Sequence, residues 1–160
     1  MAMNQLQNLL HDSLIATGHV ENCALIRRND GSLRASSVGF VPTTIEISAF
    51  INAFKTPSET RERGIKIGDE TFACFRADKF SIYAKQDSRG IILVRTSTMI
   101  LVATYSAEMY PSVCVEAIEK LGKLLFCYFF LHKYYSMLYI FYVGIQYLAK
   151  YSIFYLSSLI

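Results

Sequence analysis

Five β-rich runs follow one another closely between residues 64 and 105, and they constrain the fold more than any other feature of this sequence. Each run is rich in strand-forming residues and shows the period-two pattern of a strand. Only a few residues separate the runs, which favours antiparallel neighbours because a parallel crossover needs a dozen or more. The runs read GIKIGD, TFACFRA, KFSIYAKQ, GIILVRT and MILVATY. We therefore predict a five-stranded antiparallel meander.

The residues before this meander predict a helix, a hairpin and a second helix. Four leucines recur at three- and four-residue spacing, which places one apolar stripe on a helix that ends near Gly18: Leu6, Leu9, Leu10 and Leu14. CALIRR and SLRASS flank an Asn-Asp-Gly tripeptide that accepts the positive φ of a tight turn, so they predict two short strands. Thr43 and Glu46 form a capping box that predicts the start of the second helix.

A last helix is predicted after the meander, from Pro111 to Gly122. Proline is tolerated at a helix start, and we expect Gly122 to mark the helix end. Val113, Ala117 and Leu121 share one face of this helix. The order helix, hairpin, helix, meander, helix predicts the α/β class of the α+β type, with one antiparallel sheet and helices packed on it.

The composition changes abruptly near Gly122. No Asp or Glu occurs after Glu119, whereas eight of the eleven tyrosines lie at or beyond Tyr128. Residues 1–122 hold 13 Lys and Arg against 13 Asp and Glu, so the net charge of +3 comes from three later lysines. This balance does not indicate a nucleic-acid partner. We expect a domain over residues 1–125 and a hydrophobic, aromatic tail over residues 126–160.

The tail admits more than one interpretation. As a membrane span it is marginal, because its longest uncharged run, residues 134–149, falls short of the roughly 20 residues that cross a bilayer and holds tyrosines near its middle. We therefore do not expect transmembrane insertion, although a tail-anchored membrane protein stays open as an alternative. The tail is rich in residues with A- and T-rich codons, and Gly122-Lys123 is what the splice-donor sequence GGTAAG would encode. Our hypothesis is that the tail belongs to a splice or gene-model variant.

Other classes of function find little support. The four cysteines are far apart in the sequence and have no histidine at metal-ligand spacing: Cys23, Cys74, Cys114 and Cys127. We therefore expect buried reduced thiols, and no disulfide framework, metal site or cofactor. No phosphate loop, nucleophile motif or paired histidine occurs, so we expect no enzymatic activity. The N-terminal residues lack a basic stretch followed by an apolar run, which predicts a cytoplasmic protein without a signal peptide.

Four separated motifs, in order, carry a resemblance to a known family: ALIRRNDGSLRASS, GIKIGDETFACFRAD, SIYAKQDSRGIILVRT and LVATYSAEMYPSVCVEAIEKLG. From about Leu6 to Gly122 the chain resembles the profilins, and most of all their divergent testis-type branch. The resemblance implies a central sheet with the N- and C-terminal helices on one face and shorter helices on the other. It also implies a non-enzymatic, cytoskeleton-associated regulator of actin, with surfaces for actin monomers, proline-rich ligands and phosphoinositides. The testis-type branch implies a role in spermatogenesis and acrosome formation.

The family surface for proline-rich ligands is degenerate in this sequence. Such ligands dock as extended helices on outward-facing aromatic rings. The family pattern W-Q-x-Y aligns with residues 6–9, where Leu6 and Leu9 replace the two aromatic residues. The aromatic residue of the final G-D-Y-L aligns with Leu124, and the chain has no Trp. We predict that polyproline binding is absent or very weak.

The family surface for actin is altered as well. The family motif P-G-x-C-N reads Pro-Ser-Val-Cys-Val here, so Ser112 replaces the glycine and Val115 replaces the asparagine. An unpaired polar group on the partner costs about 1 to 3 kcal/mol per site. Arg76 and Lys85 fall where the family keeps basic residues near the actin-facing sheet. We predict weak or absent actin binding, with an authentic actin-monomer binder that controls polymerisation as the alternative.

Binding of acidic phospholipids requires only basic side chains that cluster on one surface. The stretch from residue 73 to 95 has five cations against Asp78 and Asp87: Arg76, Lys79, Lys85, Arg89 and Arg95. Each cation near an anionic membrane contributes about 1 kcal/mol, so the set could support weak, salt-sensitive, peripheral binding of phosphoinositides or phosphatidic acid. An ordinary solvated sheet edge is the alternative. Arg27 and Arg28 form a weaker candidate patch.

Overall fold

The computed structural model describes residues 3–128 and residue 131. The chain divides into two compact units, Met1–Leu124 and Leu125–Ile160. The first unit contains every residue that the sequence nominates for binding. The hypotheses about membrane insertion and intronic origin of the tail concern residues that lie almost wholly outside the described ones.

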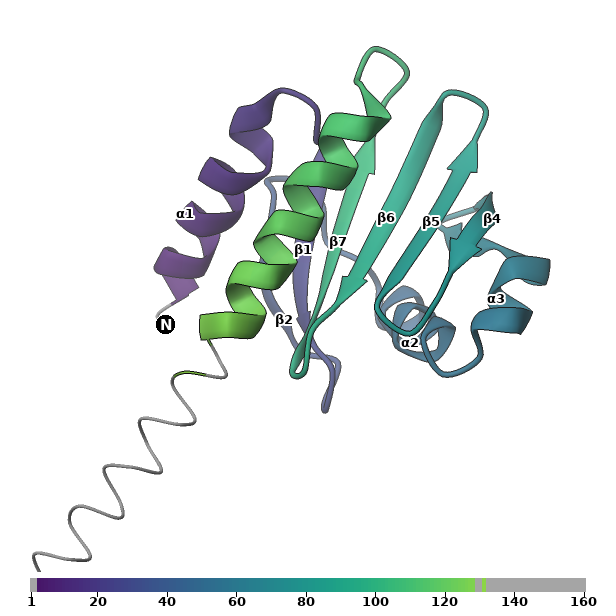
Figure 1. The fold of residues 1–160 in the computed structure, drawn as a ribbon, viewed down its shortest axis with the longest axis horizontal. Helices are drawn as coiled ribbons and strands as arrows, with labels where there is room; N and C mark the ends of the chain where they lie inside the picture. The colour runs from purple at the N-terminus through teal and green to yellow at the C-terminus, as the bar shows by residue number, and fades with distance from the viewer. Residues whose placement is uncertain (1–2, 129–130, 132–160) are drawn as a thin grey trace, which may run out of the picture. The chain divides into compact units, whose positions relative to one another are not determined.

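The first unit is built on a seven-stranded antiparallel sheet in the order β2-β1-β7-β6-β5-β4-β3 (Figure 1). The last five strands are neighbours in chain order, which confirms the predicted meander. β1 and β2 form the predicted hairpin and add to the sheet beside β7. The strands are β1 Asn22–Arg27, β2 Leu33–Ser36, β3 Ile65–Ile67, β4 Glu70–Ala77, β5 Ser81–Gln86, β6 Arg89–Arg95 and β7 Met99–Tyr105.

The predicted helices form from the expected local signals. α1 (Met3–Ser13) is followed by a short 3-10 turn (Ile15–Thr17) that ends at Gly18 with φ 74°, a left-handed value that glycine adopts without strain. α2 (Thr44–Ala53) begins with the predicted capping box, in which Thr43 and Glu46 bond each other's backbone N–H. α3 (Pro57–Arg63) was not predicted, because this short, charged helix buries only Thr60.

Our prediction that the last helix ends at Gly122 is wrong. The helix begins at residue 111, continues through residue 124, and residues 125–128 are helical as well. A Cβ at position 122 would lie 2.7 Å from Val94 Cγ1 of β6. Glycine at this position therefore allows the helix to approach the sheet closely.

The sheet separates two apolar layers, as alternation along the strands requires. On one face, which we call the α2 face, Ile26, Ile82 and Leu93 pack with Phe50 of α2. The opposite face, which we call the α1 face, is covered by α1 and the last helix (Figure 1). The fold class and the placement of the helices are confirmed.

Candidate functional site

A groove between α1 and the last helix occupies the place of the predicted degenerate polyproline cleft. Among the described residues that line it, including Ser13 and Leu121, none is aromatic. Of the three predicted cleft residues, Leu6 is 2% exposed and belongs to the core, Leu9 is half-buried, and Leu124 is 53% exposed and lines the groove. The groove therefore offers aliphatic and polar contacts where a proline-rich helix would need rings.

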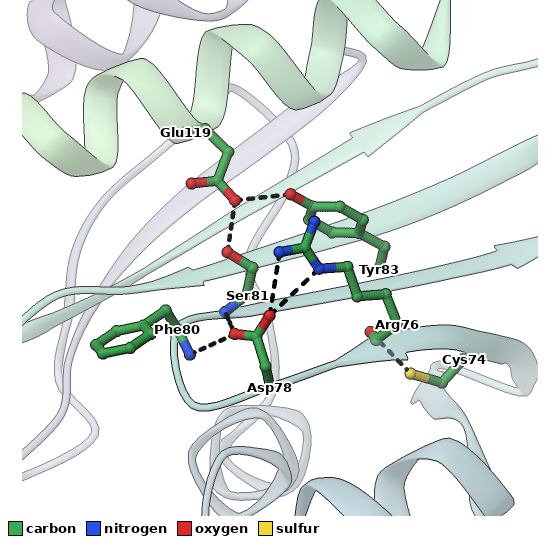
Figure 2. Close-up of polar contacts among 7 residues, drawn as sticks. All are labelled: Cys74, Arg76, Asp78, Phe80, Ser81, Tyr83 and Glu119. Atoms are coloured by element: carbon green, nitrogen blue, oxygen red, sulfur yellow. Dashed lines mark hydrogen bonds and ion pairs between the residues drawn. The ribbon is translucent and has the colours of Figure 1, made fainter.

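A network of polar side chains joins the last helix to β5 and β4 on the α1 face (Figure 2). Glu119 Oε1 accepts hydrogen bonds from Ser81 Oγ at 2.5 Å and from the Tyr83 hydroxyl at 2.7 Å. The Arg76 guanidinium lies 4.9 Å from the centre of the Tyr83 ring and donates two 3.2 Å hydrogen bonds to Asp78. The network holds one side of the helix against the two strands.

The pKa values of Tyr83 and Asp78 in this network are shifted in opposite directions. Burial raises the pKa of Tyr83 to about 12, and the hydrogen bond to Glu119 adds to this effect. Burial alone would raise the pKa of Asp78, but hydrogen bonds from the backbone N–H groups of Phe80 and Ser81 and from Arg76 outweigh it and lower this pKa. At neutral pH Tyr83 is therefore neutral and Asp78 is ionised.

The four predicted actin-facing residues lie around this network. Arg76 stands opposite Tyr83 across the β4–β5 pair, and Lys85 is two residues further along β5, so both side chains belong to the α1 face. Val115 is one helical turn before Glu119, and Ser112 is three residues before Val115. This spacing places Ser112 and Val115 on the side of the helix that contacts β5. Ser112 and Lys85 are exposed, and Val115 is half-buried.

The five predicted lipid-binding cations do not form one cluster. Arg76 and Lys85 lie on the α1 face, and Lys79 is exposed in the turn between β4 and β5. Arg89 and Arg95 stand at opposite ends of β6 on the α2 face. Arg76 and Arg89 are ion-paired with Asp78 and Glu70.

The remaining three cations of the predicted set differ from Arg76 and Arg89 in their surroundings. Lys79, Lys85 and Arg95 have no carboxylate within ion-pair distance among the described residues. They are the members of the predicted set that are free to meet an anionic ligand.

Several residues around these surfaces were missed from the sequence. Glu119 accepts a hydrogen bond from Tyr83, which is 36 residues away in the sequence. No local sequence motif can predict a contact over that separation. Phe75 is 60% exposed with its ring 6.1 Å from that of Tyr83, and Phe80 is 66% exposed. A bulge between Cys74 and Arg76 interrupts the alternation of β4, so the face of Phe75 could not be read from the period-two pattern.

The four cysteines form no disulfide with one another, and they differ in exposure. Cys23 and Cys114 are buried as predicted, and burial raises their pKa to about 11 and about 12. The prediction of burial is wrong for Cys74, which is half-buried, and for Cys127, which is exposed, because Cys74 lies on an irregular strand next to a bulge and Cys127 lies on an exposed part of the last helix. Across the described part of the chain no group of three potential ligands is arranged to hold a metal ion, and no helix is long and apolar enough to cross a membrane.

Comparison with known proteins assigns the chain and its fold to a family. The profilin family matches residues 4–126. Profilin-4 of Bos taurus is 47% identical over 124 residues, which are 77% of this chain and 96% of the relative, and Profilin-4 of Mus musculus is 44% identical over the same shares. The solved structure of Acanthamoeba castellanii profilin IA is similar with a TM-score of 0.70 and 32% identity, covering 75% of this chain and 95% of that one. The chain therefore belongs to the profilin family of non-enzymatic, actin-regulating cytoskeletal proteins.

Proposed function

We propose that this profilin acts as a lipid-responsive regulator of the cytoskeleton, binding acidic phospholipids and binding actin and polyproline weakly or not at all. The observation that carries the proposal is the pair of exposed lysines on β5 and its preceding turn. Lys79 and Lys85 have no carboxylate partner among the described residues, so neither has to leave an ion pair to meet a phosphate. We call Arg76, Lys79 and Lys85 the β4–β5 surface.

The expected strength of membrane binding follows from the number of available cations. Each basic side chain near an anionic membrane contributes about 1 kcal/mol. Arg76 is already paired with Asp78 at 3.2 Å, which reduces its contribution. With two free lysines and one shared arginine we expect weak binding that declines as salt is added, because exposed charges are screened within about 10 Å at 0.1 M salt.

The loss of polyproline binding follows from the aliphatic groove. Proline-rich helices have few hydrogen-bond donors and depend on flat aromatic contacts. Leu6 is buried in the core and Leu124 presents only an aliphatic side chain to the groove. This profilin would therefore act without partners that carry proline-rich segments.

The setting that we propose is the cytoplasm of developing sperm cells, with roles in spermatogenesis and acrosome formation. Support comes from the resemblance to the testis-type branch and from the similarity to Profilin-4 of cattle and mouse. A lipid-responsive profilin would link membranes to the cytoskeleton while the cell changes shape.

Actin-monomer binding is the second candidate function. The observation that favours it is the grouping of all four predicted actin-facing residues around one surface, next to the exposed Phe75. Val115 and Ser112 weaken this surface because they replace close and hydrogen-bonding contacts. Assembly of pyrene-labelled actin in the presence of the full chain tests this candidate, and saturable sequestration would support it.

Vesicle flotation of the full chain tests the lipid proposal. Neutral vesicles measure any binding through the tail, and vesicles with phosphatidic acid or phosphoinositide measure the added effect of acidic headgroups. We expect Lys79→Gln together with Lys85→Gln to remove most of that added effect. Arg61→Gln together with Lys66→Gln is the matched control, because these exposed cations lie on α3 and β3. Equal flotation of the two double variants on acidic vesicles would refute the proposal.

A further inference from the structure

Two arginines, Arg28 and Arg95, lie on the α2 face beside the turn that joins β6 to β7. Arg28 comes directly after β1 and, by strand alternation, shares a face with Ala24 and Ile26. Arg95 is the last residue of β6 and shares the same face with Ile91 and Leu93. The Arg28 Nη1 atom donates to the carbonyl oxygens of Thr96 at 3.2 Å and Ser97 at 2.6 Å. The Arg28 guanidinium is thus held against the turn that begins directly after Arg95.

Aromatic rings hold Arg95 in place. Its guanidinium carbon lies 5.8 Å from the centre of the Phe54 ring and 5.9 Å from the centre of the Phe80 ring. Cation–π contacts of this kind orient a guanidinium without using its N–H groups. Arg95 makes no side-chain hydrogen bond to any described residue, so its five donors remain available.

The charges of Arg28 and Arg95 have no counter-ion in the described part of the chain. Burial, together with the neighbouring charge of Arg28, lowers the pKa of Arg95. The nearby carboxylates are engaged elsewhere, because Asp30 pairs with Arg27 and Ser32, and Asp78 pairs with Arg76 and the backbone of the β4–β5 turn. Among the described residues no carboxylate lies within ion-pair distance of either Arg28 or Arg95. An anion between the two arginines would relieve their repulsion.

We propose that Arg28 and Arg95 form a binding site for a phosphate group, with the exposed ring of Phe80 at its border. A phosphate carries up to two charges and several acceptor oxygens, which suits two guanidinium forks better than a single carboxylate would. Arg28 retains Nε and Nη2 as donors after its contacts to the turn. The phosphate can belong to a soluble monoester or to a lipid headgroup. The site lies on the opposite face of the sheet from Arg76 and Lys85, so it stands independently of the β4–β5 surface.

Titration of the full chain with inorganic phosphate, and then with glycerol 3-phosphate, tests the site. Ionic strength is held constant with sodium chloride, and the arginine Nε–H resonances are followed by NMR. We expect saturable shifts at Arg28 and Arg95 and none at Arg61 or Arg63, which are exposed on α3. Because hydrogen bonds to charged groups contribute about 1.5 to 3 kcal/mol, each of Arg28→Gln and Arg95→Gln should weaken phosphate binding by about tenfold or more.

Matched variants separate binding from folding. Arg61→Gln removes the same charge from another surface and should leave phosphate affinity unchanged. Arg95→Lys keeps the charge but not the planar fork, so it should retain the fold and bind phosphate more weakly than the parent chain. Melting temperatures of all variants, measured without phosphate, show whether each remains folded.

Vesicles containing phosphatidic acid then distinguish the two sources of phosphate. If Arg28→Gln with Arg95→Gln lowers flotation on these vesicles, the ligand is a lipid headgroup, and if only soluble phosphate binding is lost, it is a soluble monoester. Absence of a saturable shift at Arg28 and Arg95, or an equal shift at Arg61, would overturn the proposal. The Lys79 and Lys85 double variant reports on the β4–β5 surface alone, so failure of one proposal is distinct from failure of the other.

Discussion

The Tyr83 hydroxyl donates a 2.7 Å hydrogen bond to Glu119 Oε1 and so ties β5 to the last helix (Figure 2). Ser81 donates a second bond, at 2.5 Å, to the same oxygen. Val115 is one turn before Glu119, and Arg76 lies over the Tyr83 ring. One carboxylate therefore joins the helix and strand parts of the predicted actin-facing surface.

Removing this carboxylate should destabilise the fold. In Glu119→Ala the buried hydroxyls of Tyr83 and Ser81 lose their acceptor, which costs about 1 to 3 kcal/mol of unfolding free energy. Tyr83→Phe should cost about 1 kcal/mol, because it removes a donor and leaves Glu119 bonded to Ser81. Urea unfolding of the two single variants and the double variant measures the coupling. Strict additivity of the two effects would contradict the role assigned to this hydrogen bond.

Stability should fall at alkaline pH. Burial raises the pKa of Cys23 from 9.0 to about 11, of Cys114 from 9.0 to about 12, and of Tyr83 from 10.0 to about 12. The folded chain holds these protons to higher pH than the unfolded chain does. Their contribution is therefore complete below about pH 9 and is lost as the pH approaches about 12.

Unfolding by urea from neutral pH to about pH 11 measures this loss. Cys114→Ala removes one of the three groups, so its stability should depend less steeply on pH than that of the parent chain. Cys127→Ala is the matched control, because it makes the same substitution at an exposed cysteine. A parent chain with constant stability across this range would exclude the expected proton linkage.

Enlarging Gly122 should separate the last helix from the sheet. A Cβ at this position would lie 2.7 Å from Val94 Cγ1, and overpacking of this kind costs about 1 to 3 kcal/mol. The gain in helix propensity from Gly122→Ala, about 1 kcal/mol, offsets part of this cost. Combined with Val94→Ala, the substitution should cost less than the sum of the single effects, because the clashing atom is gone. Thermal unfolding of the three variants measures the coupling, and a stabilised Gly122→Ala chain would refute the close approach.

Proline-rich peptide should not bind in the groove between α1 and the last helix. Isothermal titration of the full chain with a decaproline peptide should show no saturable heat, since the described lining has no aromatic ring. Leu124→Tyr places one ring on an exposed position of the groove and should produce weak, measurable binding. Tight binding by the parent chain would show that aliphatic contacts suffice.

The sequence alone determined the elements whose signals are local. The capping box of Thr43 and Glu46 lies within four consecutive residues, and the short connections between the runs of the meander favour antiparallel neighbours. The leucine spacing of α1 and the glycine at its end act within single turns of the chain. α3 escaped prediction because it buries a single residue and has no apolar stripe.

Only the tertiary structure decided which side chains share a surface. Gly122 looked like a helix end, yet its role depends on Val94 of a distant strand. Of five cations close together in sequence, Lys79 lies in a turn and the other four divide between two faces, because strand alternation separates Arg95 from Lys85. Arg28, after β1, reaches across β7 to the turn that follows Arg95, and no pattern within either segment predicts that contact. Hydrogen bonds within a turn are encoded by neighbouring residues, whereas charge clusters depend on register and packing between strands far apart in the chain.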